Sequence, residues 1–159
     1  MYELGLYEKS MPNTLSFKEK LETVKATGFD FLEMSVDETD EKLSRLEWTK
    51  EERQQLVNDM FETGVPIRSM CLSGHRKYPF GSHDASVRER SMEIMEKAIE
   101  LADDLGIRVI QLAGYDVYYE EGDADTLEFF IDNLKKATLL AAKKGIVLGF
   151  ETMETPFMN

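Results

Sequence analysis

The stretch Gly145-Ile146-Val147-Leu148-Gly149-Phe150-Glu151 is a short apolar run that ends at a carboxylate. Its length and its content of Ile, Val and Leu are typical of a strand buried on both faces, as in a parallel sheet covered by helices. Ligand sites of such sheets lie beyond the carboxyl ends of the strands. Glu151 is therefore a candidate catalytic residue. The alternative is a polar residue that only ends a buried strand.

The same pattern recurs along the chain. Four stretches with helical spacing of apolar residues each end at a glycine, and a short apolar run follows each glycine. Consecutive strand–helix units of this kind predict a parallel sheet with right-handed crossovers. The predicted strands span residues 4–7, 29–36, 65–72, 107–114 and 145–151, and the predicted helices span residues 16–28, 49–64, 86–106 and 125–145.

The loops differ according to their direction. Connections from helix to strand are very short, whereas connections from strand to helix are long and rich in polar and aromatic residues. This asymmetry is typical of a TIM barrel, in which the loops after the strands build the active face. We therefore expect an α/β fold, a partial (β/α)8 TIM barrel with about five parallel strands and four helices. The expected capping pairs of the helices are Ser16 with Glu19, Thr49 with Glu52, Ser86 with Glu89, and Asp125 with Glu128.

Length limits this interpretation. The 159 residues suit one domain, whereas a closed eight-stranded barrel needs about 200 to 250 residues. Residues 1–159 are therefore either the N-terminal portion of a larger barrel or a complete five-stranded doubly wound domain. We favour a single truncated domain, because no predicted helix covers the fifth strand and residues 156–159 resemble a loop that leads onward. An open half-barrel exposes apolar surface and strand edges, so we expect a homo-oligomer.

Composition excludes several classes of protein. The net charge of -12 argues against binding to nucleic acid or to an anionic membrane surface. Cys71 is the single cysteine, so an internal disulfide is impossible and a reducing compartment is expected. The N-terminal residues do not resemble a signal peptide, and no apolar run approaches membrane-spanning length. These features predict a cytoplasmic protein without a membrane or nucleic-acid partner.

Polar side chains follow the predicted strands. Carboxylate, imidazole and amide groups around one rim suit a divalent metal or acid–base chemistry on a sugar, although any rim is polar and the signal is weak. Sequence motifs for dinucleotide, nucleotide, zinc-protease or serine-hydrolase sites are absent. The rim residues are Glu8, Glu33, His75, Gln111, Tyr115, Asp116, Glu151 and Glu154.

The loop after the third predicted strand is the most basic and aromatic part of the chain. His75 is either a substrate contact or metal ligand, or a surface histidine. Arg76 and Lys77 are candidates for attracting a phosphate, but adjacent basic residues on a loop are more often simply solvated. By contrast, the acidic run of residues 37–41 is expected to be a solvated face. Trp48 is expected to pack at a helix start.

Three stretches carry a family resemblance. Residues 31–40 (FLEMSVDETD), 69–73 (SMCLS) and 108–119 (RVIQLAGYDVYY) closely resemble the L-ribulose-5-phosphate 3-epimerases, also called L-xylulose-5-phosphate 3-epimerases. These enzymes of L-ascorbate and pentose catabolism belong to the xylose-isomerase-like TIM barrels. The resemblance runs from residue 4 to residue 159 and implies the N-terminal part of a longer enzyme, cut after the fifth strand.

The resemblance also implies a site and a reaction. Glu151 resembles the first metal ligand and one of two acid–base carboxylates, whose family partners, an aspartate, a histidine and a second glutamate, come from later strands. Glu33, His75 and Gln111 match rim positions that contact the sugar. The implied cofactor is a divalent cation (Mn, Mg, Zn or Co), and the implied substrate is a pentulose phosphate. The full-length enzyme would abstract the proton at C3 with the help of the metal, and this chain alone would be inactive.

Two alternatives stay open at this point. The first is another isomerase, or an endonuclease, of the same barrel superfamily, although the acidic net charge weighs against a nuclease. The second is a non-catalytic binding module with a flavodoxin-like sheet.

Overall fold

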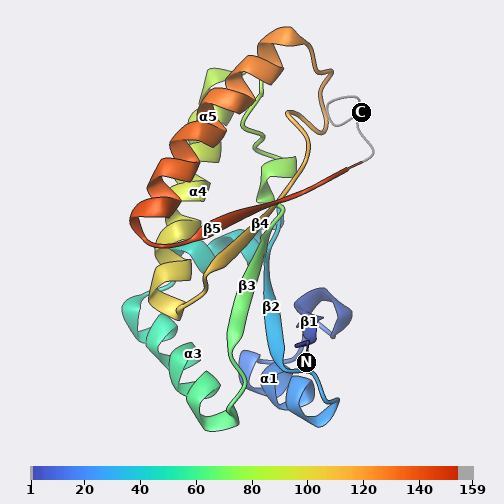
Figure 1. The fold of residues 1–159 in the computed structure, drawn as a ribbon, viewed down its shortest axis with the longest axis vertical. Coiled ribbons are helices and arrows are strands. Elements are labelled where there is room, and N and C mark those ends of the chain that lie inside the picture. The colour runs from blue at the N-terminus through green and yellow to red at the C-terminus, as the bar shows by residue number, and fades with distance from the viewer. Residues whose placement is uncertain (1, 154–159) are drawn as a thin grey trace.

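The computed structural model describes residues 2–153 and forms one parallel sheet. Its five strands are β1 (Gly5–Tyr7), β2 (Phe31–Val36), β3 (Ile67–Leu72), β4 (Val109–Ala113) and β5 (Val147–Glu151). The strands lie in the order β1-β2-β3-β4-β5, and every neighbouring pair is parallel (Figure 1). The five predicted strands are confirmed, with ends shifted by no more than two residues.

Helices follow the strands along the chain. The four predicted long helices are α1 (Phe17–Ala26), α3 (Lys50–Thr63), α4 (Ala85–Leu105) and α5 (Ala124–Lys143). Helix α1 packs against α3, α3 against α4, and α4 against α5 (Figure 1). A short helix, α2 (Asp40–Leu43), is added in the loop after β2, and single turns η1 (Glu8–Ser10), η2 (Ser44–Glu47) and η3 (Gly74–Arg76) complete the helical segments of the described region.

The sheet order separates the two architectures that the sequence left open. A doubly wound sheet reverses its strand order at a switch point, where the chain returns to the middle of the sheet. Here each strand pairs with its neighbour in the chain throughout residues 2–153. This sequential order is that of a TIM barrel. The partial barrel is therefore confirmed, and the doubly wound, flavodoxin-like alternative is wrong.

Glycines end the long helices as expected. Gly28, Gly64, Gly106 and Gly145 have φ values between 66° and 79°, the left-handed region that side chains with a Cβ avoid. The backbone N–H of Gly64 bonds to the carbonyl of Met60 at 2.9 Å and so closes the last turn of α3. Each long helix consequently stops three or four residues before the next strand begins.

Two of the four predicted helix starts need correction. Ser16 and Thr49 form the expected capping boxes with Glu19 and Glu52. In contrast, α4 and α5 begin about two residues earlier than predicted, with Asp84 and Asp123 as caps. Aspartate is as good an N-cap residue as serine, because its side chain accepts hydrogen bonds from the free backbone N–H groups of the first helical turn. Asp84 and Asp123 therefore cap α4 and α5.

The core lies between the helices and one face of the sheet. Alternate strand residues such as Leu32, Met34, Met70 and Ile110 have no exposed surface. Full burial of a large apolar side chain contributes about 1.5–3 kcal/mol. The opposite face, called the inner face below, would line the interior of a closed barrel. Alternation along each strand therefore directs one set of side chains to the core and the other to the inner face.

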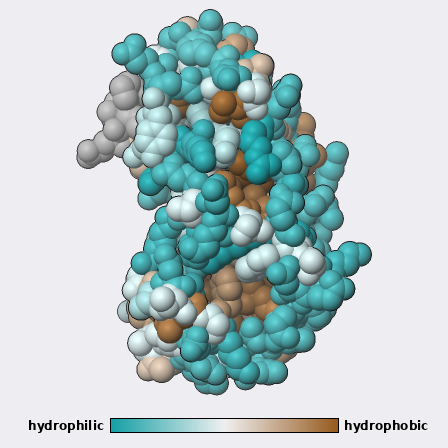
Figure 2. All heavy atoms as spheres, turned by 180° about the vertical axis from the view of Figure 1, so that it is seen from behind, coloured by the Kyte–Doolittle hydropathy of each residue, from teal (hydrophilic) through white to brown (hydrophobic). Residues whose placement is uncertain are grey.

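Apolar side chains also reach the surface. Phe61, Leu139 and Val147 are more than half exposed. Figure 2 shows apolar residues gathered in recessed areas bordered by hydrophilic side chains.

Within the described part of the chain, no helix combines the length and the apolar character needed to cross a membrane.

A buried cluster of charges lies at the end of β1. Glu8, expected on the polar rim, is instead fully buried. Its carboxylate accepts bonds from Lys20 and Lys42, each at 2.7 Å, and from Arg45 at 2.6 and 2.7 Å. It also accepts the backbone N–H of Ser35 in β2 at 2.9 Å. These four charged side chains, the charge cluster, tie η1, α1, α2 and η2 together.

The cluster holds Glu8 ionised. Burial by itself raises the pKa of the Glu8 carboxyl, but the hydrogen bonds and positive charge of Arg45, with the bonds from Lys20 and Lys42, outweigh it and bring the pKa well below its ordinary value. Arg45 also lies over the rings of Phe17 and Trp48, 4.7 and 6.0 Å from their centroids. Trp48 meets Phe17 edge-on at 5.6 Å, which confirms its predicted packing role.

Replacing Glu8 should destabilise the fold strongly. Glu8→Gln keeps the shape of the side chain but leaves three buried cations without a counter-charge, so we expect a loss of about 3–5 kcal/mol in the free energy of unfolding. Urea denaturation at pH 7 measures this loss. Glu62→Gln is the control, because it breaks an exposed ion pair with Lys18 and should have much less effect. Equal losses for the two variants would contradict the assigned role of the cluster.

Candidate active site

A hollow of about 700 Å³ lies on the inner face of the sheet. All five strands contribute to it, because alternate residues of each strand point to this side. The polar and sulfur-containing residues of this inner hollow are Tyr7, Glu33, Arg68, Ser69, Cys71, Gln111 and Glu151. Three of the four predicted site residues, Glu33, Gln111 and Glu151, are thus brought together at one surface.

An irregularity in β3 brings Ser69 to Glu33. In the pairing of β2 with β3, Leu32 lies opposite Ile67, but Glu33 lies opposite Ser69, so β3 contains one additional residue, Arg68. Such a bulge changes which side chains of a strand reach a given face. The Ser69 hydroxyl donates to Oε2 of Glu33 at 2.6 Å. Glu33 is therefore a half-buried carboxylate with one oxygen fixed by a neutral donor.

Glu151 is held by its neighbour in β4. Gln111 pairs in register with Gly149, and Glu151 pairs with Ala113, so the two polar side chains lie side by side at the carboxyl end of the sheet. The amide Nε2 of Gln111 donates to Oε2 of Glu151. Glu151 itself is exposed. One carboxylate oxygen is thereby oriented, while the other is left for a ligand or a proton.

Tyr7 and Cys71 also line the hollow. The Tyr7 hydroxyl lies 3.4 Å from Oγ of Ser35. Burial raises the pKa of Tyr7 above its ordinary value, and burial likewise raises the pKa of the Cys71 thiol. Both groups therefore stay protonated at neutral pH. Sequence reasoning missed Tyr7, Ser69 and Cys71 as site residues, although their alternation along the predicted strands was an available signal.

His75 lies apart from the other predicted site residues. Its ring is buried, with Nε2 3.2 Å from the carbonyl oxygen of Ser91 and the centroid 4.3 Å from that of Phe80. Burial lowers the pKa of His75 to about 4, so the ring is neutral at physiological pH. His75 is not among the residues that line the inner hollow.

The remaining rim residues have other surroundings. Tyr115 is buried, and Asp116 accepts the hydroxyl of Thr126 at 2.5 Å. Glu154 lies outside the described residues.

Within residues 2–153 there is no group of three or more His, Cys, Asp or Glu side chains that could hold a metal ion. The carboxylate of Glu151 and the amide oxygen of Gln111 are ligand types that suit one side of a divalent-cation site, but they do not form a complete site.

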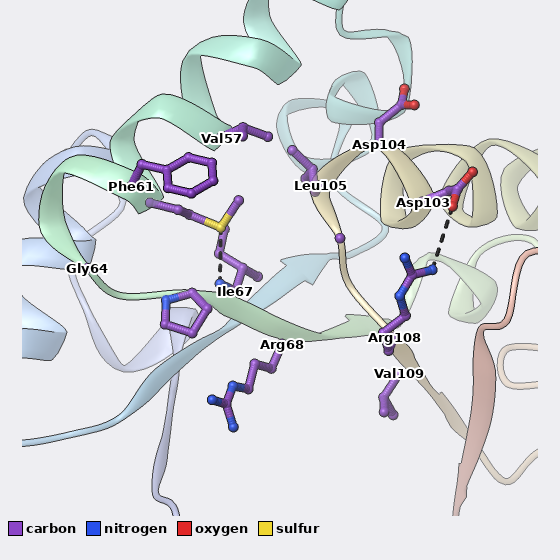
Figure 3. A pocket seen from close by; sticks show the side chains of 13 residues that line it. Val57, Phe61, Gly64, Ile67, Arg68, Asp103, Asp104, Leu105, Arg108 and Val109 are labelled. Carbon is purple, nitrogen blue, oxygen red and sulfur yellow. Dashed lines mark hydrogen bonds and ion pairs between the residues drawn. The ribbon is translucent and has the colours of Figure 1, made fainter.

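A second hollow of about 860 Å³ lies at the opposite end of the sheet. It is formed between α3, α4 and the beginnings of β3 and β4, and Figure 3 shows the largely apolar side chains of Val57, Phe61 and Leu105 around it. The Met60 sulfur there accepts the N–H of Ile67 at 3.1 Å. Because barrel active sites lie at the carboxyl ends of the strands, we assign the candidate site to the inner hollow instead.

The inner hollow has the elements of proton-transfer chemistry. It presents two carboxylates, each oriented by a hydrogen bond from a neutral donor, within a concave surface. A carboxylate held in this way can remove a proton from a bound molecule and return it. Neutral donors at its border can bind the hydroxyl and carbonyl oxygens of a small polar ligand.

Comparison with known proteins finds relatives over almost the whole chain. The chain is 54% identical over 156 residues to L-ribulose-5-phosphate 3-epimerase UlaE of Escherichia coli O139:H28 (strain E24377A / ETEC), covering 98% of the chain and 55% of that protein. It is 58% identical over 158 residues to SgbU of Escherichia coli (strain K12), covering 99% of the chain and 55% of that protein. The chain thus spans about half the length of these relatives.

The fold has relatives among solved structures. A D-psicose 3-epimerase crystallised in the presence of D-fructose matches with a TM-score of 0.80 and 19% sequence identity, covering 99% of this chain and 54% of that one. At this identity the likeness concerns the fold alone. The family described as xylose isomerase-like TIM barrel matches residues 21–159. The strand order agrees with this match, and the chain belongs to the xylose isomerase-like TIM barrel family.

Proposed function

We propose that residues 1–159 form the N-terminal part of a sugar-phosphate 3-epimerase that interconverts L-ribulose 5-phosphate and L-xylulose 5-phosphate. The main support is the carboxylate of Glu151, oriented by Gln111 at the carboxyl end of β5, in a chain 54% identical to UlaE. The proposed partner is a small sugar phosphate, and the proposed setting is pentose and L-ascorbate catabolism.

The proposed chemistry uses side chains of the inner hollow. Epimerisation at C3 of a ketose requires removal of the proton beside the C2 carbonyl and its return to the other face of the carbon. Glu151 takes or delivers that proton on one face, with its orientation maintained by the amide of Gln111. Glu33, whose position is fixed by Ser69, binds a sugar hydroxyl at the border of the site.

A divalent cation, bound by Glu151 together with ligands from further strands, would supply positive charge for the enediolate. Mn, Mg, Zn or Co all suit such oxygen and nitrogen ligands. The described residues fit one side of such a site and no more, since no three suitable ligands meet among residues 2–153. We therefore propose that the 159-residue chain by itself is inactive.

We also propose a homo-oligomer. Its support is the exposed apolar surface, including Phe61 and Val147, together with the outer edge of β1, which pairs with no second strand among residues 2–153. His75 belongs to the proposal as a further sugar contact. Its buried ring already packs against Phe80 and lies near the Ser91 carbonyl.

Glu151 should be essential for turnover. In the full-length protein, Glu151→Gln keeps the shape of the side chain but removes the base, so we expect kcat for L-ribulose 5-phosphate to fall by about 10² to 10⁴. A coupled epimerase assay and exchange of the C3 proton with deuterium in D2O measure this loss. Glu62→Gln, a glutamate on the surface of α3, is the control. An unchanged kcat in Glu151→Gln, or turnover by the 159-residue chain alone, would contradict the corresponding part of the proposal.

The burial of His75 predicts a pH dependence of stability. The folded protein keeps the His75 ring neutral down to about pH 4, whereas an unfolded histidine gains its proton near pH 6.5. The folded state therefore loses stability as pH falls from about 6.5 towards 4, by about 2 kcal/mol at pH 5. His75→Gln should remove this component of the slope in urea titrations at pH 7 and pH 5.

The second histidine provides the control for that experiment. His83 has a half-exposed side chain with Nε2 3.4 Å from Asp123, so His83→Gln should preserve the acid-sensitive component. If His75→Gln and the unmodified protein lose stability equally between pH 7 and pH 5, the ring of His75 is not held neutral by burial.

A further inference from the structure

A series of aromatic rings connects the loop after β3 to the end of β5. The ring of Phe80, in that loop, lies 6.2 Å from the ring of Phe130 in α5, measured between ring centroids. The ring of Phe130 lies 5.9 Å from that of Phe150 in β5. Phe80 and Phe130 are both buried. Phe150 directly precedes Glu151 in the chain, so these contacts reach the residue next to the candidate base.

The end of β5 is held through two neighbouring side chains and the backbone between β4 and β5. Successive side chains of a strand point to opposite sides of a sheet. Glu151 therefore meets Gln111 on the inner face, whereas the ring of Phe150 meets Phe130 of the covering helix α5. The carbonyl oxygen of Glu151 also accepts the N–H of Gly114 at 2.9 Å. A shift of Phe150 would consequently move the backbone of Glu151.

Polar and close contacts fix α5 against the loop after β3. The side-chain amide of Asn133, one turn of α5 beyond Phe130, donates to the carbonyl oxygen of Phe80 at 2.9 Å, and this bond is buried. A Cβ at Gly81 would lie 2.5 Å from the carbonyl oxygen of Thr126 in the first turn of α5, so this close approach requires glycine. Phe130 lies between these two points of α5, and its ring is therefore held in place.

The preceding residue of α5 has the same size and different surroundings. Phe129 is partly buried, and its ring centroid lies 4.0 Å from the guanidinium carbon of Arg88 in α4. Phe129 thus packs towards α4, whereas Phe130 packs towards β5. The two adjacent phenylalanines form a matched pair for an experiment.

We infer that Phe130 is a positioning residue, which acts through Phe150 on the backbone of Glu151. The inference rests on the proposed function, in which Glu151 is the base. A general base has to lie within hydrogen-bond reach of the proton that it removes, and a displacement of about 1 Å can lower the rate about 100-fold. A smaller side chain at position 130 removes the ring contact that keeps the end of β5 in place.

The first test compares turnover by variants of the full-length protein. Phe130→Leu keeps an apolar side chain but removes the ring contact with Phe150, so we expect kcat for L-ribulose 5-phosphate to fall about 10- to 100-fold with little change in KM. Phe129→Leu is the matched control and should keep the kcat of the unmodified protein. The activities are compared at a temperature at which circular dichroism shows each variant to be folded, so that loss of folded molecules does not contribute.

A second variant removes the other ring of the pair. Phe150 is 40% exposed, so Phe150→Leu places less demand on the core than Phe130→Leu does. We expect Phe150→Leu to lower kcat in the same way, and it decides the question if Phe130→Leu does not fold.

Hydrogen exchange reports on the end of β5 without any substrate. Because the N–H of Gly114 bonds to the carbonyl oxygen of Glu151, loosening of this strand end exposes that N–H to solvent. We expect the Gly114 amide to exchange about 10-fold faster in Phe130→Leu than in the unmodified protein, relative to the amides of β2, which report global unfolding. Phe129→Leu should leave this ratio unchanged. Amide exchange measured by NMR spectroscopy gives both rates.

The outcomes separate this inference from the proposed function. Equal losses of kcat in Phe129→Leu and Phe130→Leu would show that Phe130 only supports the fold, and would overturn the inference. An unchanged exchange ratio at Gly114 in Phe130→Leu would overturn it as well. If the unmodified full-length protein does not turn over L-ribulose 5-phosphate, but Phe130→Leu selectively loses protection at Gly114, the control of β5 by Phe130 is supported and the epimerase is refuted.

Discussion

Parallel pairing of each strand with its neighbour in the chain is the constraint on which this structure depends. The order β1-β2-β3-β4-β5 places the strands' carboxyl ends along a single edge and leaves an inner face, which carries the side chains of Glu33 and Glu151, opposite the buried core. Residues of different strands, such as Glu33 within β2 and Glu151 at the end of β5, therefore border one hollow. A doubly wound sheet with the same helices and strands would have covered both faces. The candidate site thus follows from the topology before any individual contact is considered.

The charge cluster around Glu8 supports this arrangement at the end of β1. A carboxylate surrounded by Lys20, Lys42 and Arg45 brings the chain after β1 and the helical segment after β2 into contact. Its bond to the N–H of Ser35 fixes the end of β2, two residues beyond Glu33. A buried ion cluster adds less net stability than its Coulomb energy suggests, because its charges lose their hydration. Its main effect here is to specify which segments meet.

The site was predictable only in part. Glu33, Gln111 and Glu151 could be identified because a polar residue within or at the end of a largely apolar run is visible in the sequence, and these three do share the inner hollow. His75 has the same kind of position in the sequence, yet the loop after β3 turns its ring towards the Ser91 carbonyl and Phe80. Likewise, Glu8 follows β1 directly, but three cations from distant segments surround it. Loop conformation and long-range charge pairing cannot be predicted from the local spacing of apolar residues in a sequence.

The sequence by itself determined the elements and their order. Helical spacing, the caps at Ser16 and Thr49, and the glycines with positive φ act within a few residues, so local chemistry is sufficient to specify them. Only the tertiary structure decided which side chains meet. Ser69 reaches Glu33 through the bulge in β3, and Gln111 reaches Glu151 through the register of β4 with β5. These pairs are 36 and 40 residues apart, and strand register is set by the packing of the whole sheet rather than by either segment.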